Sequence, residues 1–341
     1  MTAGQGTLRA GIIGCGRIAG SIEDEVLDAP GVVALPYSHA TAYREACGIE
    51  LVAVADADGE VAKRFGDRWS VDAAYSSAES MLAEAALDVV SVCAPTRFHA
   101  DLFCLAAQTS GVRGIFLEKP VGVSLAEARR MTAAAEAGDV RVAINHTRTY
   151  DPVWRRVKKL VDAGEIGDIG AITARWVEGW SFGGSHLFDL IRYLVDSHPT
   201  RVFCEPAGDE RDPGGTASLV YANGVHVQVV MLDDVSGGTE VTLLGTRGRI
   251  VVDAFGPRLY VRQADGVEAE RPFPAQLYWT SGMVRAVEEL VSAVRDGGAV
   301  SSTLDDGVAA LEIAVALNIS GTRGVPVDLP VTDHTWTVDA V

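Results

Sequence analysis

Hydrophobic positions in the first part of the chain form short runs that are apolar on both faces. Five such runs lie between Gly11 and Asn145, namely GIIG, LVAVAD, DVVSVCA, GIFLE and VRVAIN. Parallel strands covered by helices show this pattern, because neither face of the sheet meets water. Segments with helical spacing separate the runs, and Ser124 with Glu127 forms a capping box before the helix expected over 125–137. The alternation predicts a doubly wound α/β domain with a parallel sheet.

The pattern changes after Tyr150. Asp151 as N-cap and Pro152 at the first helical position predict a short helix. Long strands with tight turns follow, and Asn223 with Gly224 is typical of a two-residue hairpin loop. The second half is therefore expected to be mainly an antiparallel sheet.

Two late helices, expected over about 282–295 and 306–320, complete this half. At 341 residues the chain is long enough for two domains, each with its own core. We predict a Rossmann domain over 1–148 and, over 149–341, an α/β domain with a large, mainly antiparallel open sheet.

Composition narrows the class of protein. With 48% hydrophobic and 22% charged residues, the chain has the balance of a globular protein, and its net charge of −17 opposes binding to nucleic acids or anionic membranes. The five cysteines form no CxxC or Cys/His cluster, so we expect neither a disulfide framework nor a metal site. The N-terminus has no secretory pattern and no long apolar run occurs, which predicts a cytoplasmic location.

A glycine motif follows the first expected strand. Gly14-x-Gly16-x-x-Ala19, with Arg17 and Ile18 inside it, has the spacing of a dinucleotide-binding loop. The first glycine permits the tight turn, the second lets the backbone approach a pyrophosphate, and free N–H groups face the phosphates. The alternative is an ordinary glycine turn.

Asp56 ends the second expected strand, where a carboxylate accepts hydrogen bonds from ribose hydroxyls. It would repel a 2′-phosphate, and Arg64, although nearby in sequence, lies a turn or two inside the next helix, so NAD is favoured over NADP. The alternative role for Asp56 is a helix N-cap.

GIFLEKP places Lys119 at the carboxyl end of a strand, where open α/β sheets bind their ligands. Only four of the 29 basic residues are lysines, so a lysine in this apolar context is unusual for the chain. Its amine either loses its proton through desolvation or donates hydrogen bonds to a substrate oxygen. The alternative is a structural ion pair with Glu118 or another acid.

A second candidate lies in GWSFGGSHLFDLIRYLVD. Ser185 is the expected N-cap of a helix, and His186 lies in its first turn, where the helix dipole disfavours imidazolium and keeps the ring a competent base. Asp189, one turn on, is placed to orient it. A capping or core histidine is the alternative. The helix packs on a core through a stripe formed by Leu187, Leu190, Ile191, Leu194 and Val195.

Residues 21–36, SIEDEVLDAPGVVALP, lengthen the connection after the glycine loop. We interpret them as a surface loop near the cofactor phosphates, or alternatively as a lid or a subunit contact.

Several segments together resemble one family. GIIGCGRIAG, VCAPTRFH, GIFLEKP, INHTRTYDP, GGSHLFDLIRYL and VTLLGTRGRI occur in the order and spacing of the glucose-fructose oxidoreductase and inositol dehydrogenase family, Gfo/Idh/MocA. The resemblance covers nearly the whole chain. It implies a Rossmann domain followed by an open-sheet domain, and nicotinamide-dependent oxidation or reduction of a secondary alcohol on a sugar, cyclitol or nucleotide-sugar.

By this likeness Lys119 is the family's EKP lysine and His186 its helix histidine. Cofactor contacts are expected at the glycine loop, Asp56, Glu118, Ala94, Pro95, Thr96 and His99. Substrate contacts are expected from Arg148, Tyr150, Trp176 and Trp180, although each tryptophan is equally at home in a core.

Two departures from the family pattern stand out. Phe182 occupies a position where many members carry an aspartate, and Thr149 one where an arginine is frequent, although Arg148 remains. A phenyl ring accepts no proton, so either Lys119 and His186 are left as a two-residue acid/base set or the chemistry differs from that of the family.

In the favoured mechanism His186 takes the hydroxyl proton while Lys119 stabilises the negative charge developing on the oxygen. A redox-neutral enzyme that recycles tightly bound NAD in an epimerisation or elimination, and a non-catalytic NAD-binding regulator, are the alternatives. The exposed face of the open sheet predicts a homodimer or homotetramer.

Overall fold

The computed structural model describes residues 6–26, 36–208, 211–232, 238–274 and 280–339. Contacts divide the chain into two compact units, which are described one at a time. Unit 1 is drawn from Met1–Gly122, Ala126–Tyr150 and Thr280–Gly307, and unit 2 from Val123–Leu125, Asp151–Trp279 and Val308–Val341.

Unit 1 contains a six-stranded sheet whose paired strands are all parallel. The strand order is β3-β2-β1-β4-β5-β6. This is the predicted doubly wound sheet, and the order reverses between β1 and β4, where such sheets bind ligands at the carboxyl ends of the strands. The strands are β1 (Leu8–Ile13), β2 (Ile49–Ala55), β3 (Ala73–Tyr75), β4 (Val89–Val92), β5 (Gly114–Leu117) and β6 (Arg141–Ile144).

Helices and helical turns connect these strands. The five expected strands are confirmed, and the helix expected over 125–137 is α6. The connecting elements are η1 (Arg17–Ser21), α1 (Ile22–Val26), α2 (His39–Glu45), α3 (Gly59–Trp69), α4 (Ala78–Glu84), η2 (Thr96–Phe98), α5 (His99–Ala107), α6 (Leu125–Gly138) and α7 (Thr147–Tyr150).

The late helix α10 (Gly282–Asp296) also belongs to unit 1. Its apolar residues join those of α2 and α3 in one buried cluster on a face of the sheet, and it contacts β5 and β6. The division therefore differs from the predicted one at 148/149, because burying the apolar face of α10 returns Thr280–Gly307 to the first unit.

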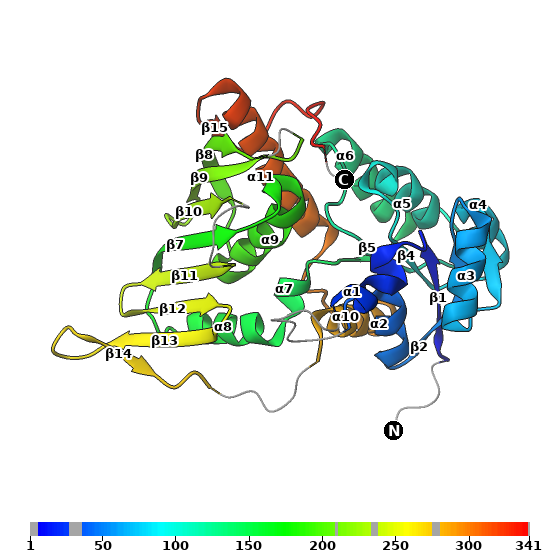
Figure 1. Cartoon of the computed structure of the whole chain (residues 1–341), viewed down its shortest axis with the longest axis horizontal. Helices are drawn as coiled ribbons and strands as arrows, with labels where there is room; N and C mark the ends of the chain where they lie inside the picture. Colours follow the sequence, from blue (N-terminus) through cyan, green and yellow to red (C-terminus); the bar gives the residue numbers. More distant parts are fainter. Residues whose placement is uncertain (1–5, 27–35, 209–210, 233–237, 275–279, 340–341) are drawn as a thin grey trace. The chain divides into compact units, whose positions relative to one another are not determined.

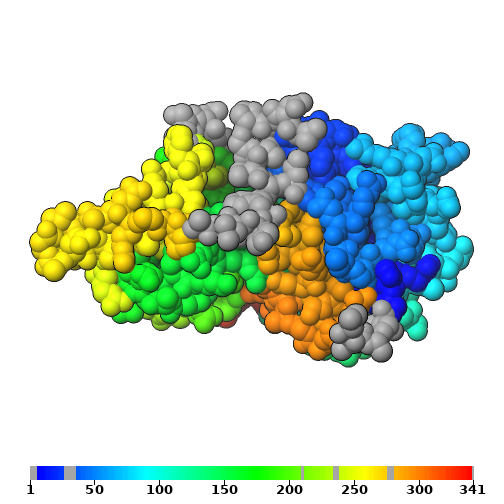
Figure 2. Space-filling view, turned by 90° about the horizontal axis from the view of Figure 1, so that it is seen from below, coloured from blue at the N-terminus to red at the C-terminus, as the bar shows by residue number. Residues whose placement is uncertain are grey.

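Unit 2 contains a nine-stranded, mostly antiparallel sheet with the order β14-β13-β12-β11-β7-β10-β9-β8-β15 (Figure 1). β7 and β10 form a parallel pair within it. The strands are β7 (Ile169–Trp176), β8 (Pro199–Ala207), β9 (Gly214–Tyr221), β10 (His226–Met231), β11 (Glu240–Gly245), β12 (Gly248–Asp253), β13 (Gly256–Arg262), β14 (Glu268–Arg271) and β15 (Val327–Asp328). The hairpin of β13 and β14 lies at the edge of this sheet (yellow and light orange in Figure 2).

The hairpin predicted at Asn223 and Gly224 joins β9 and β10, but its loop is longer than two residues. Tyr221 N donates to Val225 O, and Gly224 N donates to Tyr221 O. β9 ends at Tyr221 and β10 begins at His226, so four residues, 222–225, lie between the strands, and the positive φ of Gly224 (84°) accounts for the glycine.

Helices α8 (Pro152–Asp162), η3 (Gly179–Gly183), α9 (Gly184–Val195) and α11 (Leu304–Arg323) complete the fold. Asp151 caps α8 as predicted, by accepting a hydrogen bond from Val153 N. The prediction that Ser185 is an N-cap is wrong, because the wide turn η3 runs directly into α9 and Ser185 lies inside the helix.

Ser281 fixes the start of α10. Its buried hydroxyl accepts a hydrogen bond from Val284 N and donates to Pro36 O. We expect Ser281→Ala to lower the free energy of unfolding by about 1–2 kcal/mol, because a cap and a buried hydrogen bond are both lost. Urea denaturation measures this change. Ser292→Ala, at an exposed position of the same helix, serves as the control, and an equal loss there would contradict the assignment.

Candidate functional site

The glycine loop has two positions with different requirements. Gly14 has φ +90°, and a Cβ on it would lie 2.7 Å from Ala94 N, so no other residue fits without strain. Nothing lies within 4 Å of a Cβ built on Gly16, so the backbone is open to an approaching ligand there. η1 begins at Arg17, immediately after the loop, which places its first N–H groups at this opening.

Asp56 follows β2 and faces the same loop. Its Oδ2 accepts a hydrogen bond from Cys15 N at 2.9 Å, and its Oδ1 accepts one from Asp58 N at 2.9 Å. Each carboxylate oxygen keeps a further lone pair for a ligand hydroxyl. The helix cap of α3 is Asp58, so the cap alternative does not account for Asp56.

A cavity of about 400 Å³ lies at these strand ends. Its volume falls in the range of small-molecule and cofactor sites. Five of the predicted cofactor residues line it, namely Gly14, Gly16, Asp56, and Ala94 and Pro95 just after β4. The opposite wall of the cavity was not predicted from the sequence. Its residues come from the segment after β3 and from η2 and the start of α5, and the end of β3 was the available signal. This wall contains Ser76, Ser77, Ala78, Glu79, Phe98, Asp101 and Leu102.

The other residues predicted near the cofactor do not line this cavity. Arg17 forms an exposed ion pair with Glu25 of α1, and Ile18 packs against the core. Thr96 is buried at the start of η2.

Part of the 21–36 segment is anchored. Glu23 Oε1 accepts hydrogen bonds from Tyr37 N and Ser38 N, and Asp24 forms an ion pair with Arg68 of α3. Residues 27–35 lie outside the described residues, so the lid and subunit-contact hypotheses stay predictions.

His99 joins two strand ends. Its ring is 1% exposed, with Nδ1 2.9 Å from Pro120 O and Nε2 2.8 Å from Ala94 O. Burial lowers the pKa of His99 even though these carbonyls favour its protonated form. The imidazole therefore connects the backbone after β4 to the backbone beyond Lys119.

Glu118 precedes Lys119 and is buried. Its Oε1 lies 2.8 Å from His39 Nε2 and accepts a hydrogen bond from Asn145 Nδ2. Burial alone raises the pKa of Glu118, but the hydrogen bonds and charges of His39, Lys119 and Asn145 outweigh it and hold this pKa below its ordinary value of 4.5. The carboxylate is therefore ionised at neutral pH.

The hydrogen bonds continue from His39 into the core. His39 Nδ1 lies 2.9 Å from Ser91 Oγ, which lies 2.7 Å from the Tyr43 hydroxyl. With Nε2 donating to the Glu118 carboxylate, Nδ1 is hydrogen-bonded to Ser91, and Ser91 in turn to Tyr43. Each of the four side chains therefore has a partner. Sequence reasoning did not find His39, Ser91 or Tyr43, because they are distant in sequence from Glu118.

Lys119 comes directly after Glu118, two residues beyond the end of β5, and is half-buried. Arg148, on α7, is half-buried as well. Tyr150 is fully buried, and its hydroxyl donates to Ser302 O and accepts from Ser302 N.

Unit 2 holds the second group of predicted residues. His186 is half-buried in the first turn of α9, and Asp189 is buried one turn on, on the same side of the helix. Gly183 lies where η3 meets α9, and a Cβ on it would be 2.0 Å from Val177 O, so the approach of the chain to β7 requires glycine.

The two tryptophans predicted at the substrate are buried. Trp176 is 5% exposed and its Nε1 donates to Gly183 O, while Trp180 has no exposed surface and stacks on Phe188. This burial favours the core alternative for both indole faces.

Phe182 is exposed, and its backbone N–H is held from another element. Asp212, before β9, accepts hydrogen bonds from Ser181 N and Phe182 N at 2.9 Å each. Sequence reasoning missed Asp212, which orders the wide turn that leads into the His186 helix.

Within the described residues, no cluster of three or more His, Cys, Asp or Glu side chains is arranged to hold a metal ion. Across the same part of the chain, no helix has the length and apolar character needed to cross a membrane.

A parallel sheet with this loop, this carboxylate and a cavity at the strand-order reversal defines the class of dinucleotide-binding Rossmann proteins. Residues 8–146 match the model described as "Oxidoreductase family, NAD-binding Rossmann fold", and residues 154–251 match the "GFO/IDH/MocA C-terminal domain". The chain belongs to the GFO/IDH/MocA family of oxidoreductases, and its cofactor is NAD.

Relatives cover most of the chain. An inositol 2-dehydrogenase of Rhizobium meliloti is 25% identical over 91% of this chain and 96% of its own. A D-apiose dehydrogenase of Paraburkholderia graminis is 26% identical over 86% of each chain. In fold, the chain is similar to an oxidoreductase from Agrobacterium radiobacter in complex with NAD+, L-tartaric acid and magnesium, with a TM-score of 0.79, 19% identity, and 94% and 98% of the two chains covered.

The low pKa of Glu118 makes stability depend on pH. Its stabilising effect is fully present above its ordinary pKa of 4.5 and is lost as the pH falls through its lower folded-state pKa. We expect the free energy of unfolding of the wild type to fall more steeply below about pH 4.5 than that of Glu118→Gln. Urea titrations from neutral to acidic pH measure both slopes. Glu60→Gln, at an exposed position, is expected to keep the wild-type slope, and equal slopes for all three proteins would refute the assignment.

Proposed function

We propose that this chain is an NAD-dependent dehydrogenase that interconverts a secondary alcohol and a ketone on a cyclitol, a sugar or a nucleotide-sugar. The observation that carries the proposal is Lys119 at the carboxyl end of β5, directly after a buried and ionised Glu118. Membership of the oxidoreductase family and similarity to inositol and apiose dehydrogenases support the substrate class.

The cofactor cavity of unit 1 fits NAD. Gly16 leaves room for a pyrophosphate, and Asp56 offers carboxylate lone pairs to ribose hydroxyls while repelling a 2′-phosphate. These features support NAD over NADP. When bound, NAD supplies the hydride acceptor.

Lys119 is assigned the charged role. The adjacent Glu118 carboxylate interacts favourably with an ammonium, and this attraction is one of the causes that lower the pKa of Glu118. An ammonium donates a hydrogen bond to the substrate oxygen and stabilises the negative charge that develops as the hydroxyl loses its proton.

His186 is assigned the role of base. His186 lies half-buried in the first turn of α9, and one nitrogen of its imidazole accepts the hydroxyl proton in the proposed reaction. Asp189, one turn on, is proposed to orient it. Phe182 accepts no proton, so the acid/base work falls to His186 and Lys119. Arg148 is proposed as a substrate contact.

We also propose that the enzyme acts in the cytoplasm as a homodimer or homotetramer. All five cysteines are free thiols, which supports a reducing compartment. Val230 and Leu244, each 38% exposed, flank β7 on the same face of the unit 2 sheet, and such apolar exposure supports a subunit contact there.

Replacement of Lys119 tests the proposed chemistry. We expect Lys119→Met to lower kcat roughly 100- to 10,000-fold, because the methionine side chain neither donates a hydrogen bond nor carries charge. Binding of NAD, followed by quenching of protein fluorescence, is expected to change little.

Lys63→Met, at an exposed position of α3, is the matched control and is expected to keep the wild-type kcat. A Lys119→Met enzyme that retains most of its kcat would overturn the assignment.

A further inference from the structure

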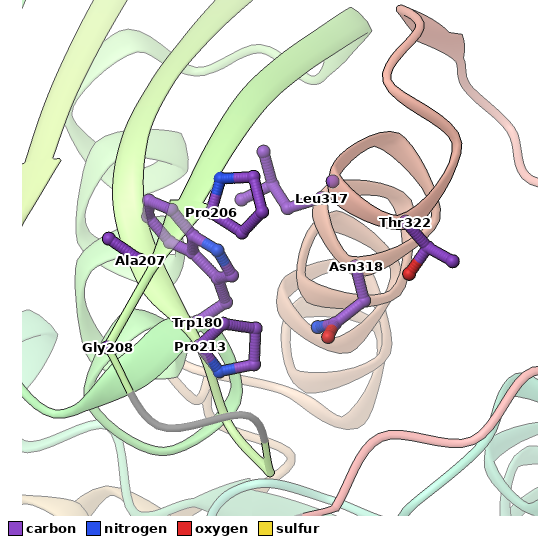
Figure 3. A pocket seen from close by; sticks show the side chains of 9 residues that line it. Trp180, Pro206, Ala207, Gly208, Pro213, Leu317, Asn318 and Thr322 are labelled. Carbon is purple, nitrogen blue, oxygen red and sulfur yellow. The ribbon is translucent and has the colours of Figure 1, made fainter.

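Unit 2 contains a second cavity, which the proposed reaction does not use. It has a volume of about 320 Å³ and lies between α11 and the region where β8 ends and β9 begins (Figure 3). None of the nine described lining residues carries a charge. They are Trp180, Pro206, Ala207, Gly208, Pro213, Leu317, Asn318, Gly321 and Thr322.

The side chain of Trp180 is the exceptional feature of this cavity. It has no exposed surface, and its Nε1 has no hydrogen-bond partner within the described part of the chain. The edge of the indole that carries Nε1 faces the cavity (Figure 3). Trp176, four residues earlier, donates from its own Nε1 to Gly183 O, as buried indoles usually do. Buried donors are normally hydrogen-bonded, so a buried N–H directed into a cavity indicates that an acceptor atom of a ligand pairs with it there.

The rest of the lining defines what kind of molecule brings that oxygen. Asn318 Nδ2 donates one hydrogen to Ala314 O, which leaves its second N–H as a donor and its amide oxygen as an acceptor for a ligand hydroxyl. Thr322 adds a hydroxyl at the rim, one helical turn further along α11. Pro206, Pro213 and Leu317 supply apolar walls.

We propose that this cavity binds the ring of a neutral saccharide or cyclic polyol, with Trp180 Nε1 donating to a ligand oxygen and Asn318 Oδ1 accepting from a ligand hydroxyl. The absence of charged groups from the nine lining residues disfavours phosphates and carboxylates, whose burial requires a paired charge. The volume is at the small end of the range for ligand pockets, which suits one ring. None of the side chains assigned to the reaction is among the described lining residues, so the proposal does not depend on their roles.

Binding of a ligand in this cavity affects the helix that carries His186 through the backbone. Trp180 lies in η3, which continues directly into α9, and Asp212 already holds the amides of Ser181 and Phe182. A ligand bound to Trp180 therefore stabilises the same turn. The cavity would then be a second sugar site, coupled through this turn to the helix that carries His186.

The test uses the full-length protein with ¹⁵N-labelled indoles. The Trp180 Nε1–H resonance is assigned by its disappearance in Trp180→Phe, and myo-inositol and glucose are then titrated, with gluconate as the anionic comparison. We expect a saturable shift of this resonance with a neutral probe, a weaker response to gluconate, and about a tenfold loss of affinity in Asn318→Leu.

Lys119→Ala separates this site from the proposed reaction, since the shift is expected to persist in that variant. The proposal is overturned if the Trp180 resonance does not move up to the solubility limit of both neutral probes, or if Asn318→Leu leaves the affinity unchanged.

A second measurement addresses the unpaired donor without any ligand. Trp176→Phe and Trp180→Phe remove the same ring atoms from two buried sites, but only Trp176 loses a hydrogen bond. We expect the larger fall in Tm for Trp176→Phe. A larger fall for Trp180→Phe would show that its N–H is already satisfied by the protein, which contradicts the proposal.

Discussion

The contact between His39 and Glu118 is the interaction on which the proposed chemistry of unit 1 depends. A carboxylate buried at the end of β5 is costly unless donors surround it, and removing one partner leaves the charge uncompensated. His39 Nε2 and Asn145 Nδ2 provide those donors, from the start of α2 and the end of β6. The same carboxylate favours an ammonium on the next residue, Lys119.

The residues directly before and at the start of α2 are held by their own hydrogen bonds. His39 is the first residue of α2, and Ser38 caps that helix by accepting a hydrogen bond from Thr41 N. Glu23 in turn holds the amides of Tyr37 and Ser38. The short helix α2 thus fixes the position of the imidazole that supports Glu118 at the end of β5.

Much of unit 1 was predictable from sequence, because its determinants are local. Runs of apolar residues defined the strands, and the spacing of Gly14 and Gly16 defined the loop, whose φ and close contacts then explained the first glycine. The His39 network was not predictable, because its members lie 79 residues apart in sequence and only the strand order brings them together. The placement of α10 on the first unit depends on the same long-range packing.

In unit 2 the helix carrying His186 was found by its apolar stripe, whereas its beginning was not. A serine before a helical pattern usually marks a cap, but here the wide turn η3 displaces the helix start and Asp212 performs the capping from another element. The length of the 222–225 loop was missed for a similar reason, since Asn-Gly also occurs inside longer turns. Local signals thus located the elements, and tertiary contacts set their ends.

The most direct test of the account is absorbance at 340 nm when the wild-type protein is mixed with NAD and each of a panel of inositols, aldoses and nucleotide-sugars. We expect free NADH to accumulate in proportion to the substrate consumed when NAD is supplied, and much less reduced cofactor to form with NADP. Conversion of a sugar without any release of NADH would contradict it and indicate a redox-neutral enzyme with recycled cofactor. Binding of NAD with no turnover of any compound would indicate a regulator instead.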